Sequence, residues 1–165
     1  MRNTMNEIIQ IKMILECDVK KAFSMFSGKQ EVCSWLAVDA NIELRLGGKY
    51  ELFWDVKDRV NNSTIGCRIN GLEIGRMIAF EWKGPAEYKH LMNSVDPLTQ
   101  VIVFFTALDS SETGDNPQTE ILLLHIGWRS TEKWEECRRW FLKAWESAIK
   151  KLKSECRSEH TKSSW

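Results

Sequence analysis

Alternation of apolar and polar residues dominates the chain before residue 130. It recurs in seven stretches, which are 9–15, 42–46, 50–54, 65–69, 78–82, 101–108 and 119–128. Side chains of a strand point alternately to opposite faces, so a period of two predicts strands that bury one face. The pattern therefore predicts seven antiparallel strands.

Two short helices are expected between the first and second strands. Asp18 is a candidate N-cap, and apolar residues follow it at helical spacing over residues 19–26. Residues 27–30 have the pattern of a capping box, which predicts a second short helix that ends near Trp35.

A long amphipathic helix is expected after Thr131, which is a suitable N-cap. The period changes to 3.6, which predicts a helix over residues 132–154, roughly 35 Å long at 1.5 Å per residue. Residues 155–165 are predicted to form a polar, frayed tail. The apolar stripe of the helix consists of Trp134, Cys137, Phe141, Trp145, Ala148 and Leu152.

Connections between the strands are polar or rich in glycine. Gly47-Gly48 predicts a tight hairpin turn, and residues 57–63 and 110–117 predict polar loops. The connection from Gly84 to Pro97 is long and has no clear periodicity. Connections of this length often form functional lids.

Together these elements predict one α+β domain over residues 1–154. A sheet with one apolar face must be covered, and the long helix is the element that can cover it. We expect a curved antiparallel sheet of six to seven strands wrapped around that helix. A twisted sheet that curls around a helix leaves an apolar space where packing is incomplete.

Composition narrows the class of function. The chain has 165 residues, 43% of them hydrophobic, and a formal net charge of +0, which is typical of a globular domain. Balanced charge argues against nucleic-acid binding, and no apolar run reaches the ~18 residues of a membrane span. The five cysteines lack C-x-x-C spacing, so we expect reduced thiols in a cytoplasmic protein without a metal site or cofactor.

Several motifs, taken in their order along the chain, resemble the START-like superfamily, also called SRPBCC, which has the helix-grip fold. The matching segments are the first strand with residues 18–23, then Trp35, the turn at 47–50, residues 123–128, and the helical segment 145–152. Within the superfamily, the chain is most similar to the branch of the activator of heat-shock-protein-90 ATPase. The resemblance covers nearly the whole chain.

The resemblance implies a deep hydrophobic cavity, with several roles open. Members of the superfamily include lipid or polyketide binders, cyclases, hydrolases and chaperone-linked domains. A chaperone partner is implied by the resemblance alone. Activators of the chaperone ATPase are similar to two-domain proteins with a separate N-terminal domain, for which we expect no room in this chain.

Candidate catalytic groups are few. His125 shares a strand face with Ile121 and Leu123, and the resemblance places that face against the cavity. A histidine there could act as a general acid or base, or orient a ligand. A core histidine satisfied by one hydrogen bond is the favoured interpretation, because no carboxylate partner can be assigned to it. We therefore predict no catalytic residue.

Charged residues on the strands are expected to form pairs on the outer face. Glu51 lies near Lys49, and Glu81 and Arg68 occupy polar positions of two successive strands. Such cross-strand pairs are typical of a solvated sheet face, so we predict no buried site among them.

Aromatic residues give the stronger signal, because the chain has eight tryptophans. Large rings line cores, interfaces and pockets, and this many are hard to bury in one tight layer. A plain core and a cavity wall both remain open as interpretations, and a row of rings favours flat or apolar ligands. The candidate wall consists of Trp35, Trp54, Trp82, Phe105, His125, Trp134, Phe141 and Trp145.

The sequence thus favours a small-molecule binding domain for a lipid-like or aromatic ligand, active as a monomer or homodimer. A chaperone-linked interaction protein is the alternative. A cyclase or hydrolase that uses His125 ranks third, because no second catalytic group can be named.

Overall fold

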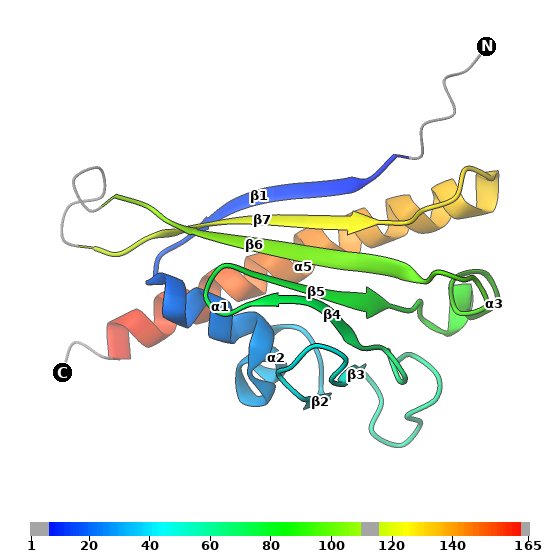
Figure 1. Cartoon of the computed structure of the whole chain (residues 1–165), viewed down its shortest axis with the longest axis horizontal. Helices are drawn as coiled ribbons and strands as arrows, with labels where there is room; N and C mark the ends of the chain where they lie inside the picture. Colours follow the sequence, from blue (N-terminus) through cyan, green and yellow to red (C-terminus); the bar gives the residue numbers. More distant parts are fainter. Residues whose placement is uncertain (1–6, 110–115, 163–165) are drawn as a thin grey trace, which may run out of the picture.

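The computed structural model describes residues 7–109 and 116–162, with side chains described up to residue 157. Its main layer is a five-stranded antiparallel sheet in the order β1-β7-β6-β5-β4 (Figure 1). The strands are β1 (Ile9–Leu15), β4 (Ile69–Glu73), β5 (Met77–Trp82), β6 (Thr99–Ala107) and β7 (Thr119–Ile126). Most of the predicted loop at 110–117 lies outside the described residues.

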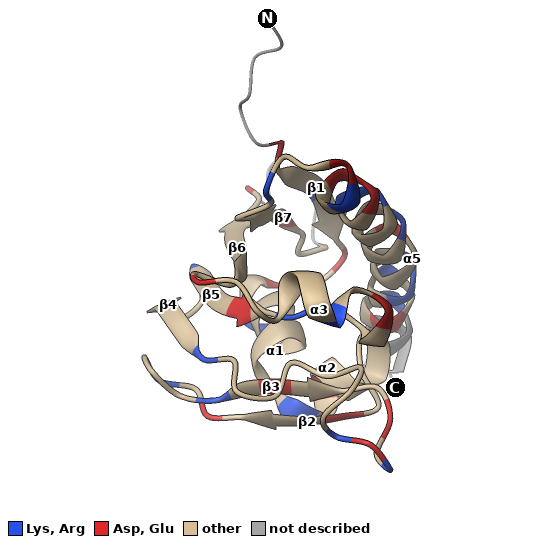
Figure 2. Cartoon of the chain, turned by 90° about the vertical axis from the view of Figure 1, so that its right-hand side faces the viewer, with Lys and Arg blue, Asp and Glu red and all other residues tan. Residues whose placement is uncertain are grey.

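The long helix α5 (Glu132–Lys162) lies against one face of this sheet (Figure 1). Lys, Arg, Asp and Glu residues alternate along its outward side, as Figure 2 shows. This side faces solvent, while the predicted stripe faces the sheet. The predicted α+β architecture, an antiparallel sheet wrapped around one long helix, is confirmed.

Smaller elements close the lower end of the molecule in Figure 1. They are α1 (Val19–Ser27), α2 (Lys29–Trp35) and a two-stranded sheet of β2 (Asp39–Ile42) and β3 (Tyr50–Phe53). The predicted lid segment contains a 3₁₀ helix, η1 (Ala86–Tyr88), and a short helix, α3 (Lys89–Met92).

The helices α1 and α2 differ in how their N-termini are capped. The N-cap Asp18 accepts a hydrogen bond from Lys21 N at 2.8 Å, as predicted for α1. The capping box predicted for α2 is wrong. The pattern places the N-cap at Ser27, but the extended residue between the two helices is Gly28. Gly28 is therefore the N-cap of α2, and it makes no side-chain capping bond.

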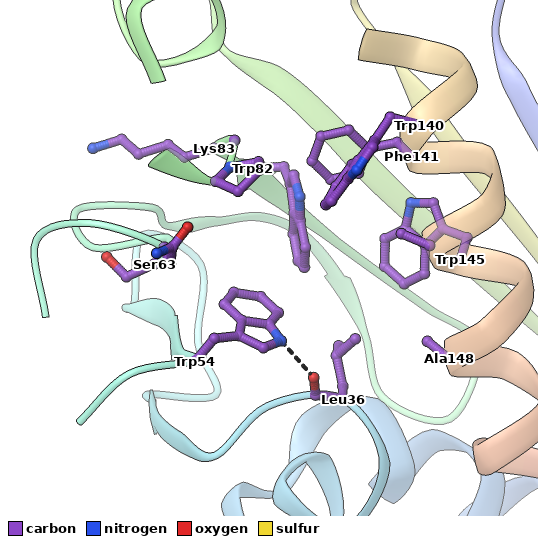
Figure 3. Close-up of a pocket in the computed structure, with 13 residues that line it drawn as sticks. Leu36, Trp54, Ser63, Trp82, Lys83, Trp140, Phe141, Trp145 and Ala148 are labelled. Carbon is purple, nitrogen blue, oxygen red and sulfur yellow. Dashed lines mark hydrogen bonds between the residues drawn. The ribbon is translucent and has the colours of Figure 1, made fainter. Parts of the chain in front are cut away.

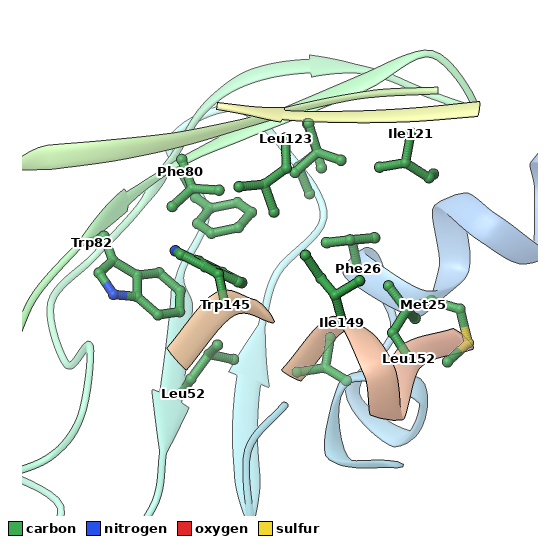
Figure 4. Close-up of a cluster of buried hydrophobic side chains, with 14 of the residues drawn as sticks. Met25, Phe26, Leu52, Phe80, Trp82, Ile121, Leu123, Trp145, Ile149 and Leu152 are labelled. Carbon is green, nitrogen blue, oxygen red and sulfur yellow. The ribbon is translucent and has the colours of Figure 1, made fainter. Parts of the chain in front are cut away.

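The core lies between α5 and the sheet. Phe80, Ile121 and Leu123 point from the sheet toward Trp145 and Leu152 of α5 (Figure 4). All five side chains are buried, which places apolar area from the sheet and from α5 in one cluster. This contact fixes the helix on the sheet and leaves the side of α5 nearest β5 to form the pocket described below.

Two of the seven predicted strands are shifted along the chain. β2 ends at Ile42, so Leu44 and Leu46 are exposed rather than inward-facing. The chain leaves the ladder because residues 43–48 form their own turn hydrogen bonds, with Gly47 at φ 77°. β4 begins only at Ile69, because a turn with Gly66 at φ 89° precedes it.

The last helix is longer than the pattern predicts. It continues to Lys162 instead of ending at Ser154, so residues 155–162 are helical. The buried Cys156 on this extension is hydrogen-bonded to the thiol of Cys17, which raises the pKa of Cys17 above its ordinary value. A tertiary contact with the first strand region thus supports a segment whose own composition is polar.

Glu51 lies inside rather than on the outer face, so its predicted pairing with Lys49 is wrong. Its carboxylate accepts hydrogen bonds from Gly66 N at 2.7 Å and from Asn41 Nδ2 at 3.3 Å. The side chain is buried because it holds the turn before β4 against β3. Glu81 likewise accepts from the backbone of Arg68 rather than forming an ion pair with it.

Candidate functional site

An apolar pocket of about 340 Å³ opens between α5, the end of β5 and the loop after β3 (Figure 3). Thirteen of the residues that the structure describes line it, and none of these thirteen is acidic. They are Leu36, Trp54, Asn62, Ser63, Trp82, Lys83, Gly84, Pro85, Trp140, Phe141, Ala144, Trp145 and Ala148.

Indole rings form most of the wall. Trp82 packs edge-on against Trp54, with ring centroids 5.9 Å apart, and at a tilt of 42° against Trp145, with centroids 5.3 Å apart. Trp82 and Trp145 are buried, whereas Trp54 and Trp140 are 38% and 39% exposed. The exposed pair therefore stands at the mouth, and the buried pair forms the inner wall.

Alanines on α5 provide the space. Trp140, Ala144 and Ala148 recur every four residues, so they form one row on the helix that runs along the edge of the predicted stripe and joins it at Ala148. Methyl side chains in this row leave a gap opposite the indoles of Trp54 and Trp82. The pocket thus follows from small residues on the helix facing large residues on the sheet and its loop.

His125 lies directly behind this wall. Its Nδ1 accepts a hydrogen bond from Trp145 Nε1 at 3.1 Å, and its Nε2 lies 3.1 Å from Thr99 Oγ1. Because an indole N–H can only donate, Nδ1 carries no proton, so Nε2 carries it and donates to Thr99. Thr99 Oγ1 in turn donates to the carbonyl of Trp82 at 3.5 Å.

This network holds two wall tryptophans in place through one neutral imidazole. His125 is fully buried among the rings of Trp82, Trp128, Phe141 and Trp145. Burial lowers the pKa of His125 to about 3, since a charged ring would lose its hydration. The imidazole therefore stays neutral at ordinary pH and keeps the hydrogen bond from Trp145.

The loop after β3 and the segment after β5 form the mouth opposite α5, and hydrogen bonds join these two segments. Asn62 Oδ1 accepts from Ala86 N at 2.8 Å, and Asn61 Oδ1 accepts from Lys89 Nζ at 2.8 Å. Asn62 has a φ of 52°, which an asparagine tolerates better than most residues. The predicted lid segment thus borders the pocket at Gly84 and Pro85.

Four of the eight predicted wall residues line the pocket, namely Trp54, Trp82, Phe141 and Trp145. The other four do not border it. Trp35 donates to Met25 O behind α1, and Phe105 packs on Phe23. Trp134 packs on Trp128 near the start of α5, and His125 lies behind Trp145.

Trp140, Lys83 and Ala144 border the pocket but were not predicted to do so. The repeat of Trp140, Ala144 and Ala148 at every fourth position was the signal that could have found the helix side of the site. Inward-facing stripe positions predict the core, whereas a pocket forms at the edge of the stripe, where half-buried residues meet solvent.

No family model and no curated protein matches this sequence. Among solved structures, the fold is similar to that of a protein from Mesorhizobium loti. The TM-score is 0.68 at 14% identity, covering 90% of this chain and 95% of that chain. It is also similar to the Aha1 dimer from Colwellia psychrerythraea, with a TM-score of 0.61 at 12% identity, covering 90% and 94% of the two chains.

An HSP90 activator from Plasmodium falciparum is similar as well, with a TM-score of 0.55 at 17% identity, covering 78% of this chain and 79% of that chain. The chain has the helix-grip fold. At these identities, the likeness to helix-grip proteins establishes the fold alone. The resemblance to the activator branch in particular stays a prediction.

Within residues 7–109 and 116–162, no three His, Cys, Asp or Glu side chains are placed to hold a metal ion together. In that same part of the chain, no helix combines the length and apolar character that crossing a bilayer requires.

Proposed function

We propose that this protein binds a flat, apolar and uncharged small molecule in the pocket beside α5. The observation that carries the proposal is the wall of four tryptophans and one phenylalanine around an open space of about 340 Å³. Stacked and edge-on contacts with indoles favour planar ligands. The absence of acidic side chains from the lining gives a cation no counter-charge.

An open apolar pocket is energetically unfavourable when it is empty, because the side chains of its wall stay in contact with water. Two half-exposed indoles at the mouth keep large apolar area in contact with water, and a ligand would remove that area from water at about 25 cal/mol per Å². The hydrogen-bonded network from Thr99 to Trp145 holds the wall in one arrangement before any ligand arrives.

Filling the pocket tests the proposal. Ala144→Trp places an indole in the open space, so we expect naphthalene to bind the natural chain and to bind this variant at least about tenfold more weakly. Lys143→Trp is the matched control, because it adds the same side chain at an exposed neighbour on α5 that does not line the pocket. Binding is measured by quenching of tryptophan fluorescence. Equal affinity for both variants would remove the pocket as the binding site.

Association with a chaperone of the heat-shock-protein-90 type is a second candidate. It is supported by the similar fold of the HSP90 activator from Plasmodium falciparum. Exposed apolar residues near β2 and β3, including Val38, Leu46 and Val60, also support it. Stimulation of the chaperone's ATPase by the purified chain would support it, and failure to associate would reject it.

Catalysis by His125 receives no support from the geometry. A general acid or base must come within hydrogen-bond reach of the reacting group. Both ring nitrogens of His125 are already bonded, the side chain is fully buried, and its pKa near 3 keeps it neutral. His125 is a positioning residue for the wall.

A further inference from the structure

Trp82 carries an indole N–H for which no described residue is an acceptor. The side chain is only 3% exposed, and it lines the pocket. Within the described residues, every fully buried side-chain nitrogen has a hydrogen-bond partner. The Trp82 N–H therefore reaches open space, and the open space beside this ring is the pocket.

Three other side-chain N–H donors of the wall, on Trp54, Lys83 and Trp145, are already engaged. Trp54 Nε1 and Lys83 Nζ each donate to a main-chain carbonyl, at 2.8 and 2.6 Å, and Lys83 extends away from the indoles in Figure 3. Trp145 Nε1 donates to His125. Trp140 has no described acceptor for its N–H either, but it is 39% exposed at the mouth, where water is available.

We propose that the Trp82 N–H selects ligands that carry a neutral hydrogen-bond acceptor, such as a ketone oxygen, on a flat apolar body. This inference rests on the proposed function. A ligand that fills the inner pocket excludes water from this N–H, so the ligand must supply an acceptor or leave the donor unpaired. Sites built around one buried donor discriminate strongly against analogues that lack its partner.

Two nearly isosteric probes test this selectivity, 2-acetylnaphthalene and 2-isopropenylnaphthalene, which differ by a carbonyl oxygen in place of a methylene group. We expect the natural chain to bind the ketone about three- to tenfold more tightly than the hydrocarbon. Trp82→Phe keeps a ring and removes the donor, so the preference should vanish. Trp140→Phe makes the same change at the mouth and should retain the preference.

The possible outcomes distinguish a failure of the role given to the Trp82 N–H from a failure of the proposed function. Equal binding of both probes to the natural chain, or a ketone preference that survives in Trp82→Phe, overturns the role of the N–H but leaves the pocket's function intact. Failure of both probes to bind overturns the proposed function and this inference with it. If Trp82→Phe does not fold, the Trp82 indole proton resonance of the natural chain decides. It should move further downfield with the ketone than with the hydrocarbon, and equal shifts would overturn the proposal.

Discussion

The Trp145→Ala substitution is expected to lower the free energy of unfolding by about 3–5 kcal/mol, as large aromatic truncations in a core do. Trp145 is 3% exposed, packs on Trp82 and donates its N–H to His125. Its loss removes buried ring area and leaves a histidine nitrogen without its donor. Trp145→Phe keeps most of the ring and should cost less, about 1–3 kcal/mol. Denaturation in urea measures both variants.

Trp140→Ala is the control for this prediction. It removes the same side chain from the same pocket and the same helix, but Trp140 is 39% exposed and its indole nitrogen has no described acceptor. We expect a loss of about 1 kcal/mol or less, typical of a partly exposed position. Similar losses for Trp140→Ala and Trp145→Ala would contradict the role assigned to the network behind the wall.

Lowering the pH from 6.5 should destabilise the protein through His125 while most of the protein's carboxylates are still ionised. The pKa of His125 falls from 6.5 to about 3 on folding, because the ring is fully buried. Between these values the unfolded chain binds a proton that the folded chain does not. The contribution of His125 to the free energy of unfolding should therefore be constant above pH 7. It should fall by about 1.4 kcal/mol for each pH unit below 6.5, to a loss of about 3 kcal/mol at pH 4.

His125→Gln serves as the control for the acid response, because glutamine does not titrate. The difference in unfolding free energy between the natural chain and this variant cancels the contributions of other groups. Among these is Asp39, whose pKa the neighbouring Arg59 lowers to about 2. A difference that does not change between pH 7 and pH 4.5 would contradict the account. The imidazole carbon-bound proton resonances of His125 should likewise stay constant above pH 4.

Much of the fold could be predicted because the large sheet follows simple alternation. In β7, Ile121, Leu123 and His125 share the buried face, as their parity indicates. The misplaced strands have a different cause. Leu44 and Leu46 continue the alternation, but the turn at Gly47 forms hydrogen bonds that end the ladder at Ile42. A repeating pattern cannot show where such a tertiary turn begins.

The site could be predicted only in part, because a sequence pattern shows which face a residue occupies and not which residues it contacts. Strand parity placed Trp82 inward and the helical period placed Trp145 inward, and both line the pocket. Strand parity placed His125 on the same sheet face as Trp82, but only the position of α5 determines that the Trp145 ring covers it. Trp140 was missed because it lies beside the stripe rather than in it, where packing decides between surface and pocket.

The most direct test of ligand binding in the pocket is an NMR titration of the indole N–H resonances with naphthalene. The account predicts saturable shifts for Trp54, Trp82, Trp140 and Trp145, which line the pocket. The resonances of Trp35 and Trp128, whose N–H groups donate to buried carbonyls elsewhere, should stay in place. Absence of shifts at the four pocket tryptophans, or equal shifts at all six, would contradict it.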